Sequence, residues 1–186
     1  MVGPGGRRAP VRPVQDGKPV RAQRGQSLVE FSLVLTPLLL ILLGIVQFGF
    51  IFNSYVTLTN ATREAAREGS IYVYDRTQNK DWNDLARNNR IRTSLLSSMN
   101  LLGKTAPNFT TGSTWTASGL TFTNGDLTVA YSIPAGVTDS DPRTGQRITV
   151  TARYHQDLII PFISSLLPQD AGGRLVLTGE VTMVAN

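Results

Sequence analysis

The sequence predicts an α+β protein: a long N-terminal helix packs on an antiparallel β-sheet of about four strands, together with one further helix. Three observations lead to this fold class. An uncharged run covers residues 31–62, and its first part is almost wholly apolar. Residues 81–102 repeat apolar side chains at helical spacing. The last third of the chain is rich in Thr, Val, Ile and aromatic residues with rough period-two alternation, which is typical of strands.

The net charge is confined to the N-terminal end of the chain. The 186 residues carry a formal net charge of +5. Residues 1–25 contain six basic side chains and one acidic one, whereas residues 26–186 contain twelve of each. A nucleic-acid-binding protein needs basic side chains gathered on a folded face, so we expect no nucleic-acid partner. The chain also lacks cysteine, which excludes disulfides and thiolate metal sites.

Composition divides the chain into three regions. Residues 1–25 combine Gly, Pro and Arg without apolar periodicity. Such a stretch buries too little surface to offset the entropy of ordering, so we predict a basic, disordered leader. Residues 26–69 are predicted to form a transmembrane and extended helix. Residues 70–186 are predicted to form an extracytoplasmic α+β domain.

The first half of the long helix is predicted to cross a membrane. Residues 31–52 are nearly all Leu, Ile, Val, Phe and Gly, and at about 1.5 Å per residue they reach across a ~30 Å hydrocarbon core. This run is longer than the core of a secretory signal, and no small-residue cleavage pattern follows it, so we expect it to be retained. The basic leader favours a cytoplasmic N-terminus. We therefore expect a single-pass protein of the cell membrane.

Proline and glycine predict where this helix bends and ends. Pro37 lies inside the apolar run, and it removes the amide that would bond to the carbonyl of Leu33, so we predict a kink there. Residues 53–68 contain neither Pro nor Gly, and Gly69 is a plausible terminator. The result is one helix of roughly 40 residues, about 60 Å long, whose second half lies outside the membrane.

The rest of the chain is predicted to hold one helix and four strands. The helix covers residues 81–102 and stops at Gly103. The strands are expected over residues 114–123, 126–133, 147–154 and 174–184. Asn124-Gly125 is a strong tight-turn signal between the first two strands. Residues 158–167 form an apolar connection that is too short to span a bilayer.

The sequence offers no pattern for catalysis. His155 is the only histidine and lies at a strand end, where a structural or exposed role is expected. Asp139-Ser140-Asp141-Pro142 resembles turn chemistry more than a calcium loop, because the further ligands of such a loop are missing. No nucleophile elbow, phosphate-binding loop or acid–base pair is present. We therefore expect no enzyme, no cofactor, no metal and no small-molecule substrate.

Four stretches of the N-terminal region together resemble a known family. They are Arg24-Gly25-Gln26-Ser27-Leu28-Val29-Glu30-Phe31, Leu35-Thr36-Pro37-Leu38-Leu39-Leu40, Gln47-Phe48-Gly49 and Asn60-Ala61-Thr62-Arg63-Glu64-Ala65-Ala66-Arg67-Glu68-Gly69. This pattern resembles the TadE family, pilin-like (pseudopilin) proteins of the tight-adherence, or Flp, type IV pilus system. The resemblance covers roughly residues 24–69. The later β-rich part agrees with the family only in outline.

The resemblance implies a processing site and an assembly role. Gly25 would be the last leader residue, cut on the cytoplasmic side by the prepilin peptidase, and Gln26 would become the mature N-terminus. Glu30 would then be the fifth mature residue, followed by Phe31. The implied function is a minor pilin or assembly component of adhesive pili, with other pilin-like subunits and the assembly machinery as partners. Whether it enters the pilus after processing stays open.

Glu30 has two interpretations, of which the second depends on the cleavage that the resemblance implies. A carboxylate in the first turn of a helix is favourable by roughly 0.3–1 kcal/mol, because it meets the unpaired amides there. Alternatively, after leader removal, Glu30 of one subunit pairs with the α-amino group of Gln26 on its neighbour. Such a pair would set the register of packed membrane helices more than their stability.

The main rival function belongs to a different class. It is an unprocessed single-pass membrane-anchored protein whose extracytoplasmic domain binds a ligand or partner. Cleavage separates the two functions, because a pilin loses residues 1–25 and a plain anchor keeps them.

Overall fold

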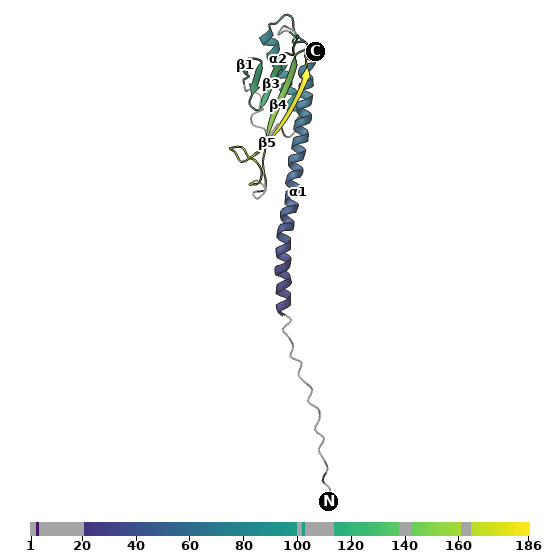
Figure 1. Cartoon of the computed structure of the whole chain (residues 1–186), viewed down its shortest axis with the longest axis vertical. Helices are drawn as coiled ribbons and strands as arrows, with labels where there is room; N and C mark the ends of the chain where they lie inside the picture. Colours follow the sequence, from purple (N-terminus) through teal and green to yellow (C-terminus); the bar gives the residue numbers. More distant parts are fainter. Residues whose placement is uncertain (1–2, 4–20, 100–101, 103–113, 138–142, 161–164) are drawn as a thin grey trace. The chain divides into compact units, whose positions relative to one another are not determined.

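A computed structural model describes residues 3, 21–99, 102, 114–137, 143–160 and 165–186. The predicted turn at residues 139–142, the predicted helix stop at Gly103 and most of the leader lie outside these residues. The chain divides into two compact units, Met1–Ile41 and Leu42–Asn186. The second unit holds a second helix, a five-stranded sheet and the C-terminal part of the long helix (Figure 1).

Helix α1 covers Arg21–Ser70, which is 50 residues and longer than predicted at both ends. The N-terminal extension follows from the sequence Arg-Ala-Gln-Arg before Gly25, because these residues have high helix propensity. The leader therefore enters the helix at Arg21, before the predicted boundary at residue 25. At the other end Gly69 lies inside the last turn, so its predicted role as terminator is wrong. A Cβ atom there would lie 2.6 Å from Ile91 Cδ1, so glycine is needed for close packing.

Helix α2 covers Lys80–Ser98 and confirms the second predicted helix with a shorter C-terminal end. Asn79 caps its N-terminus, because the Asn79 side chain accepts a 2.9 Å hydrogen bond from the backbone N–H of Trp82. At the other end, the backbone N–H of Met99 donates to the carbonyl of Leu95 at 2.9 Å. The cap residues thus set both ends of the helix.

The sheet is antiparallel and its five strands lie side by side in chain order. They are β1 (Thr116–Ser118), β2 (Thr121–Asn124), β3 (Leu127–Ser132), β4 (Arg147–Gln156) and β5 (Leu175–Val184). The strand predicted over residues 114–123 is in fact the hairpin β1–β2, so the prediction of four strands is one short. Gly119, with φ of +59°, reverses the chain there. The tight turn predicted at Asn124-Gly125 joins β2 to β3 but lies one residue later, at Gly125-Asp126, because Asn124 ends β2 and pairs with Leu127. Gly125 also has φ of +59°.

One face of the sheet packs on the long helix, as predicted, and α2 joins the same core. Alternate side chains of β3 and β4 are buried, and they pack with apolar side chains of the C-terminal part of α1 and of α2. The fully buried members are, in α1, Leu58, Ala61, Ala65 and Ala66; in α2 and its C-cap, Ile91, Leu95 and Met99; in β3, Leu127 and Val129; and in β4, Ile148, Val150 and Ala152.

Small residues let α1 approach the sheet closely. Ala61, Thr62, Ala65 and Ala66 are buried, whereas the charged residues that alternate with them, Arg63, Glu64 and Arg67, are exposed. On β5, a Cβ atom added to Gly179 would lie 2.7 Å from Thr62 Oγ1. The alternation of small and charged residues in the last turns of α1 is therefore explained by packing against the sheet.

Candidate functional site

The predicted processing site lies within the first turns of α1. Gly25 is exposed, and a Cβ atom there would meet nothing within 4 Å. Because α1 begins at Arg21, the backbone around Gly25 is helical. In the uncut chain the helix therefore continues through Gly25, and the backbone there is not extended. A peptidase would have to unwind this turn, and glycine lowers that cost by about 1 kcal/mol relative to alanine.

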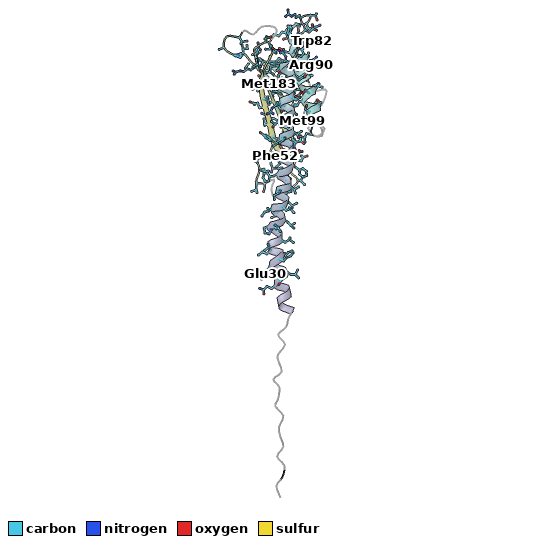
Figure 2. The ribbon with its side chains drawn as sticks, turned by 90° about the vertical axis from the view of Figure 1, so that its right-hand side faces the viewer. Glu30, Phe52, Trp82, Arg90, Met99 and Met183 are labelled. Carbon is cyan, nitrogen blue, oxygen red and sulfur yellow. The ribbon has the colours of Figure 1, made fainter. Side chains whose placement is uncertain are left out.

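Glu30 lies beside Gln26 on the same helix. The Nε2 atom of Gln26 donates a 3.1 Å hydrogen bond to Oε1 of Glu30, and both side chains are exposed. Phe31 follows and is also exposed. Figure 2 shows Glu30 projecting from the N-terminal part of α1. In the uncut chain Glu30 is nine residues past the helix start, so the proposed first-turn role applies only to a chain that begins at Gln26.

Pro37 lies inside α1, and the helix continues through it. The hydroxyl of the preceding residue, Thr36, donates to the backbone carbonyl of Ser32 at 3.0 Å. This contact does not replace the amide that Pro37 removes, because the carbonyl that loses its donor is that of Leu33. The kink at Pro37 stays a prediction.

A single helix within the described part of the chain, over Gly25–Ser70, is a candidate membrane span by length and composition. Its most apolar 18-residue window has a mean hydropathy of 2.4, and none of that window is buried. Large apolar side chains such as Leu33, Ile41 and Phe52 are more than half exposed. This is the exposure that a lipid-facing helix requires.

The structure reveals two polar contacts on α1 that local sequence patterns do not predict. Gln47 is buried, and its Oε1 accepts a 2.9 Å hydrogen bond from the backbone N–H of Ile159. Two turns later, the hydroxyl of Ser54 donates to Oε1 of Gln156 at 2.6 Å. The only sequence signal was an amide side chain within an apolar run. Its partner lies 112 residues away, beyond the reach of local periodicity.

A buried charged cluster joins α2 to the segment before β4. Arg143 donates to both carboxylate oxygens of Asp84, at 2.7 and 2.6 Å, and Arg87 lies 3.8 Å from the same carboxylate. All three side chains are almost fully buried. The guanidinium of Arg143 lies 4.4 Å from the ring of Tyr131, and that of Arg87 lies 4.9 Å from the ring of Tyr72. Arg143 and Arg87 thus both lie near the carboxylate of Asp84, and each guanidinium also contacts an aromatic ring.

Tyr131 completes this cluster as a neutral hydrogen-bond donor. Burial raises the pKa of Tyr131 well above its ordinary value. Its hydroxyl therefore stays protonated, and it contacts Oδ1 of Asn88 at 2.6 Å. Among the described residues, the contacts of the cluster are those of a structural network.

His155 links two aspartates at one end of the sheet. Its Nδ1 lies 2.5 Å from Oδ2 of Asp170, and its Nε2 lies 3.2 Å from Oδ1 of Asp126. The expected structural role of His155 agrees with these contacts. Burial lowers the pKa of His155, but the hydrogen bonds to both aspartates outweigh burial and the net shift is upward. The hydrogen bond from the Arg174 backbone, followed by that from His155, lowers the pKa of Asp170.

These pKa shifts predict a pH dependence of folding stability. The folded state holds the His155 proton more tightly than the unfolded chain, whose pKa is near 6.5. The stabilisation is therefore complete below about pH 6.5 and is lost as pH rises through the folded pKa. The Asp170 contribution has the opposite sign, being present above its ordinary value of 3.8 and lost on acidification. The summed stabilisation from His155 and Asp170 is therefore largest between about pH 3.8 and pH 6.5.

Replacing His155 with Gln should remove the alkaline part of this dependence. As the pH is raised from 6 to 8, we expect the urea concentration at half-unfolding to decrease for the detergent-solubilised wild-type protein. The same quantity should change less for H155Q. The control is D157N, which removes a nearby exposed carboxylate and should keep the wild-type slope. If the urea midpoint depends on pH equally in wild type and H155Q, His155 is not the source of the alkaline pH dependence.

Comparison with known proteins gives one match. The family model described as TadE-like protein matches residues 25–67, which confirms the resemblance over this part of α1. No curated protein and no solved structure matches the chain. The matched region contains Gly25, Gln26, Glu30, Phe31 and Pro37, together with Gln47 and the small residues that pack on the sheet.

Proposed function

We propose that this protein is a minor pilin, or pseudopilin-like structural or assembly component, of a tight-adherence (Flp) type IV pilus. The observation that carries the proposal is the TadE-like match over residues 25–67, which coincides with the start of the candidate membrane span. The proposal includes cleavage by a prepilin peptidase after Gly25. It includes no enzymatic activity, no cofactor, and no nucleic-acid or small-molecule partner.

The proposed topology places residues 1–25 in the cytoplasm and the C-terminal domain outside. The basic leader supports this orientation, because positive charges beside a span favour the cytoplasmic side. The region beyond the span, residues 53–186, is nearly balanced, with twelve basic and eleven acidic side chains. In this orientation the peptidase meets Gly25 at the cytoplasmic membrane surface.

Glu30 is the proposed assembly residue, and Phe31 lies beside it. In the described structure Glu30 is exposed and accepts a hydrogen bond from Gln26 of its own helix. After cleavage Gln26 carries a new α-amino group, which is positive near neutral pH. We propose that Glu30 then pairs with this amine on a neighbouring subunit. A subunit in the wrong register would leave both charges unpaired in a low-dielectric setting, at a cost of several kcal/mol.

Replacing Glu30 with Gln tests the pairing, because it keeps the shape and removes the charge. We expect E30Q to be inserted and cleaved but to be lost from sheared pilus or cross-linked pilin fractions. The matched control is E64Q, on the exposed face of the same helix, where Glu64 makes only a 3.9 Å surface ion pair with Arg67. If E30Q assembles as well as E64Q at equal expression, the pairing role is wrong.

The alternative is an unprocessed single-pass anchor with an extracytoplasmic binding domain. The candidate span fits this function equally well. The TadE-like match favours the pilin function, because it begins at the proposed cleavage residue. An anchor keeps its original N-terminus and does not depend on the charge of Glu30.

A further inference from the structure

We propose that the apolar segment after β4 is a second membrane contact, inserted into the outer leaflet beside α1 and positioned there by Gln47. Its described parts are residues 158–160 and 165–167. The inference rests on the proposed transmembrane topology of α1. The partner is the lipid at the boundary between headgroups and acyl chains.

The contact between Gln47 and Ile159 fixes the segment against the apolar part of α1. Gln47 is buried, and its Oε1 accepts the backbone N–H of Ile159 at 2.9 Å. Just before this segment, Gln156 accepts a hydrogen bond from Ser54 of α1. Two hydrogen bonds, two helical turns apart, therefore hold the chain that leaves β4 alongside the helix as it runs back toward the apolar residues.

The position of Gln47 along the helix gives the depth of the segment. Phe52 is the last residue of the proposed span, and Gln47 lies five residues before it. At about 1.5 Å per residue this is a depth of roughly 7.5 Å, within the 5–10 Å typical of segments that lie in the membrane interface. If α1 spans the membrane, Ile159 is below the membrane surface.

The side chains of the segment suit lipid rather than water. Ile159 is 68% exposed and Leu166 is 72% exposed. Residues 158–167 carry no charge. A cavity of about 100 Å³ between helix and segment is lined by Leu43, Val46, Gln47, Phe50, Ile159 and Ile160. Acyl chains can cover these apolar side chains without leaving a charge unpaired.

Backbone chemistry explains why Gln47 is needed at this depth. An unpaired backbone N–H in hydrocarbon costs several kcal/mol, so non-helical chain requires a polar partner there. Gln47 supplies the acceptor for Ile159. A polar side chain inside a membrane helix is itself expensive. The hydrogen bond satisfies the Oε1 atom of Gln47, while its Nε2 atom is buried without a hydrogen-bond partner in the described structure. Gln47 is thus a positioning residue for the segment.

The cysteine-free chain allows a direct depth measurement. Single cysteines replace Ile159, Leu166, Leu39 in the span and Thr182 on the exposed face of β5, and each is labelled with an environment-sensitive fluorophore. The full chain is reconstituted in phosphatidylcholine vesicles that contain phosphatidylglycerol. Nitroxide on the acyl chains and aqueous iodide serve as quenchers. We expect probes at Ile159 and Leu166 to respond to acyl-chain nitroxide and to be several-fold less accessible to iodide than the Thr182 probe.

Three results would overturn the inference, and they are distinguishable. If the Leu39 probe is in lipid but the Ile159 probe behaves like Thr182, the segment is not inserted and the topology stands. If the Ile159 probe is protected from both quenchers, the segment contacts protein instead of lipid. If the Leu39 probe is exposed to iodide, the proposed span fails and the inference fails with it.

A second variant tests the positioning role of Gln47. We expect Q47L to increase iodide access to the Ile159 probe severalfold, because the Ile159 N–H loses its acceptor. The matched control is T36V, which removes a hydroxyl that bonds only within α1 in the described structure. Unchanged depth of the Ile159 probe in Q47L would overturn the role of Gln47.

Discussion

Replacing Asp84 with Ala is expected to lower the free energy of unfolding by about 3–5 kcal/mol, the usual cost of leaving a buried charge without its partner. Asp84 is the carboxylate nearest both Arg143 and Arg87 among the described contacts, and all three side chains are almost fully buried. Without Asp84, the two buried guanidinium groups beside Tyr131 would lose the carboxylate that they share. Urea or thermal unfolding of the detergent-solubilised protein measures the loss.

The matched control is D81A, in the first turn of the same helix. Asp81 is exposed, and its removal should cost only about 0.3–1 kcal/mol through the helix dipole. The double variant D84L/R143L should recover part of the loss, because it removes one cation together with the carboxylate. If D84A is no less stable than D81A, the buried cluster contributes nothing to the fold.

Replacing Gly25 with Leu is expected to block processing almost completely. A bulky side chain hinders the close approach of a peptidase to the backbone at Gly25. The structure adds a second reason, because Gly25 lies within α1 and Leu stabilises the helix that must open. The variant should accumulate in the membrane as a larger form that keeps residues 1–25. An immunoblot of membrane fractions, with a peptidase-deficient strain as reference, measures this.

Two further variants separate the causes. G25A increases helix propensity as much as Leu does but adds only a methyl group. If unwinding limits cleavage, G25A is blocked as strongly as G25L; if bulk limits it, G25A is largely cut. The control G49L places the same side chain at a glycine of α1 where a Cβ atom meets nothing within 4 Å, and it should be processed normally. Normal processing of G25L would remove the proposed site.

The elements of the fold were predictable where a local pattern decides them. The burial alternation of β4 and the cap at Asn79 follow from nearby residues. The hairpin β1–β2 was missed, because Gly119 stands in an otherwise continuous strand pattern. The role of Gly69 was misjudged, because a glycine that ends a helix and one that permits close packing look alike in sequence. Only Ile91, from another helix, distinguishes them.

The long-range contacts of the candidate site could not be predicted from the sequence. The TadE-like pattern points to Gly25, Gln26 and Glu30, which lie within the matched residues 25–67, and their roles stay predictions. The pairing of Arg143 with Asp84 joins positions 59 residues apart, and that of Gln47 with Ile159 joins positions 112 apart. Such contacts depend on how the elements pack, so no periodicity or motif within one segment encodes them.

The N-terminus of the protein extracted from its native membrane tests the proposed function most directly. N-terminal sequencing together with intact mass distinguishes a processed pilin-like subunit from a permanent anchor. We predict that the mature chain begins at Gln26 and lacks residues 1–25. A chain in the same membranes that still begins before Gln26, with an active prepilin peptidase present, would contradict the proposal.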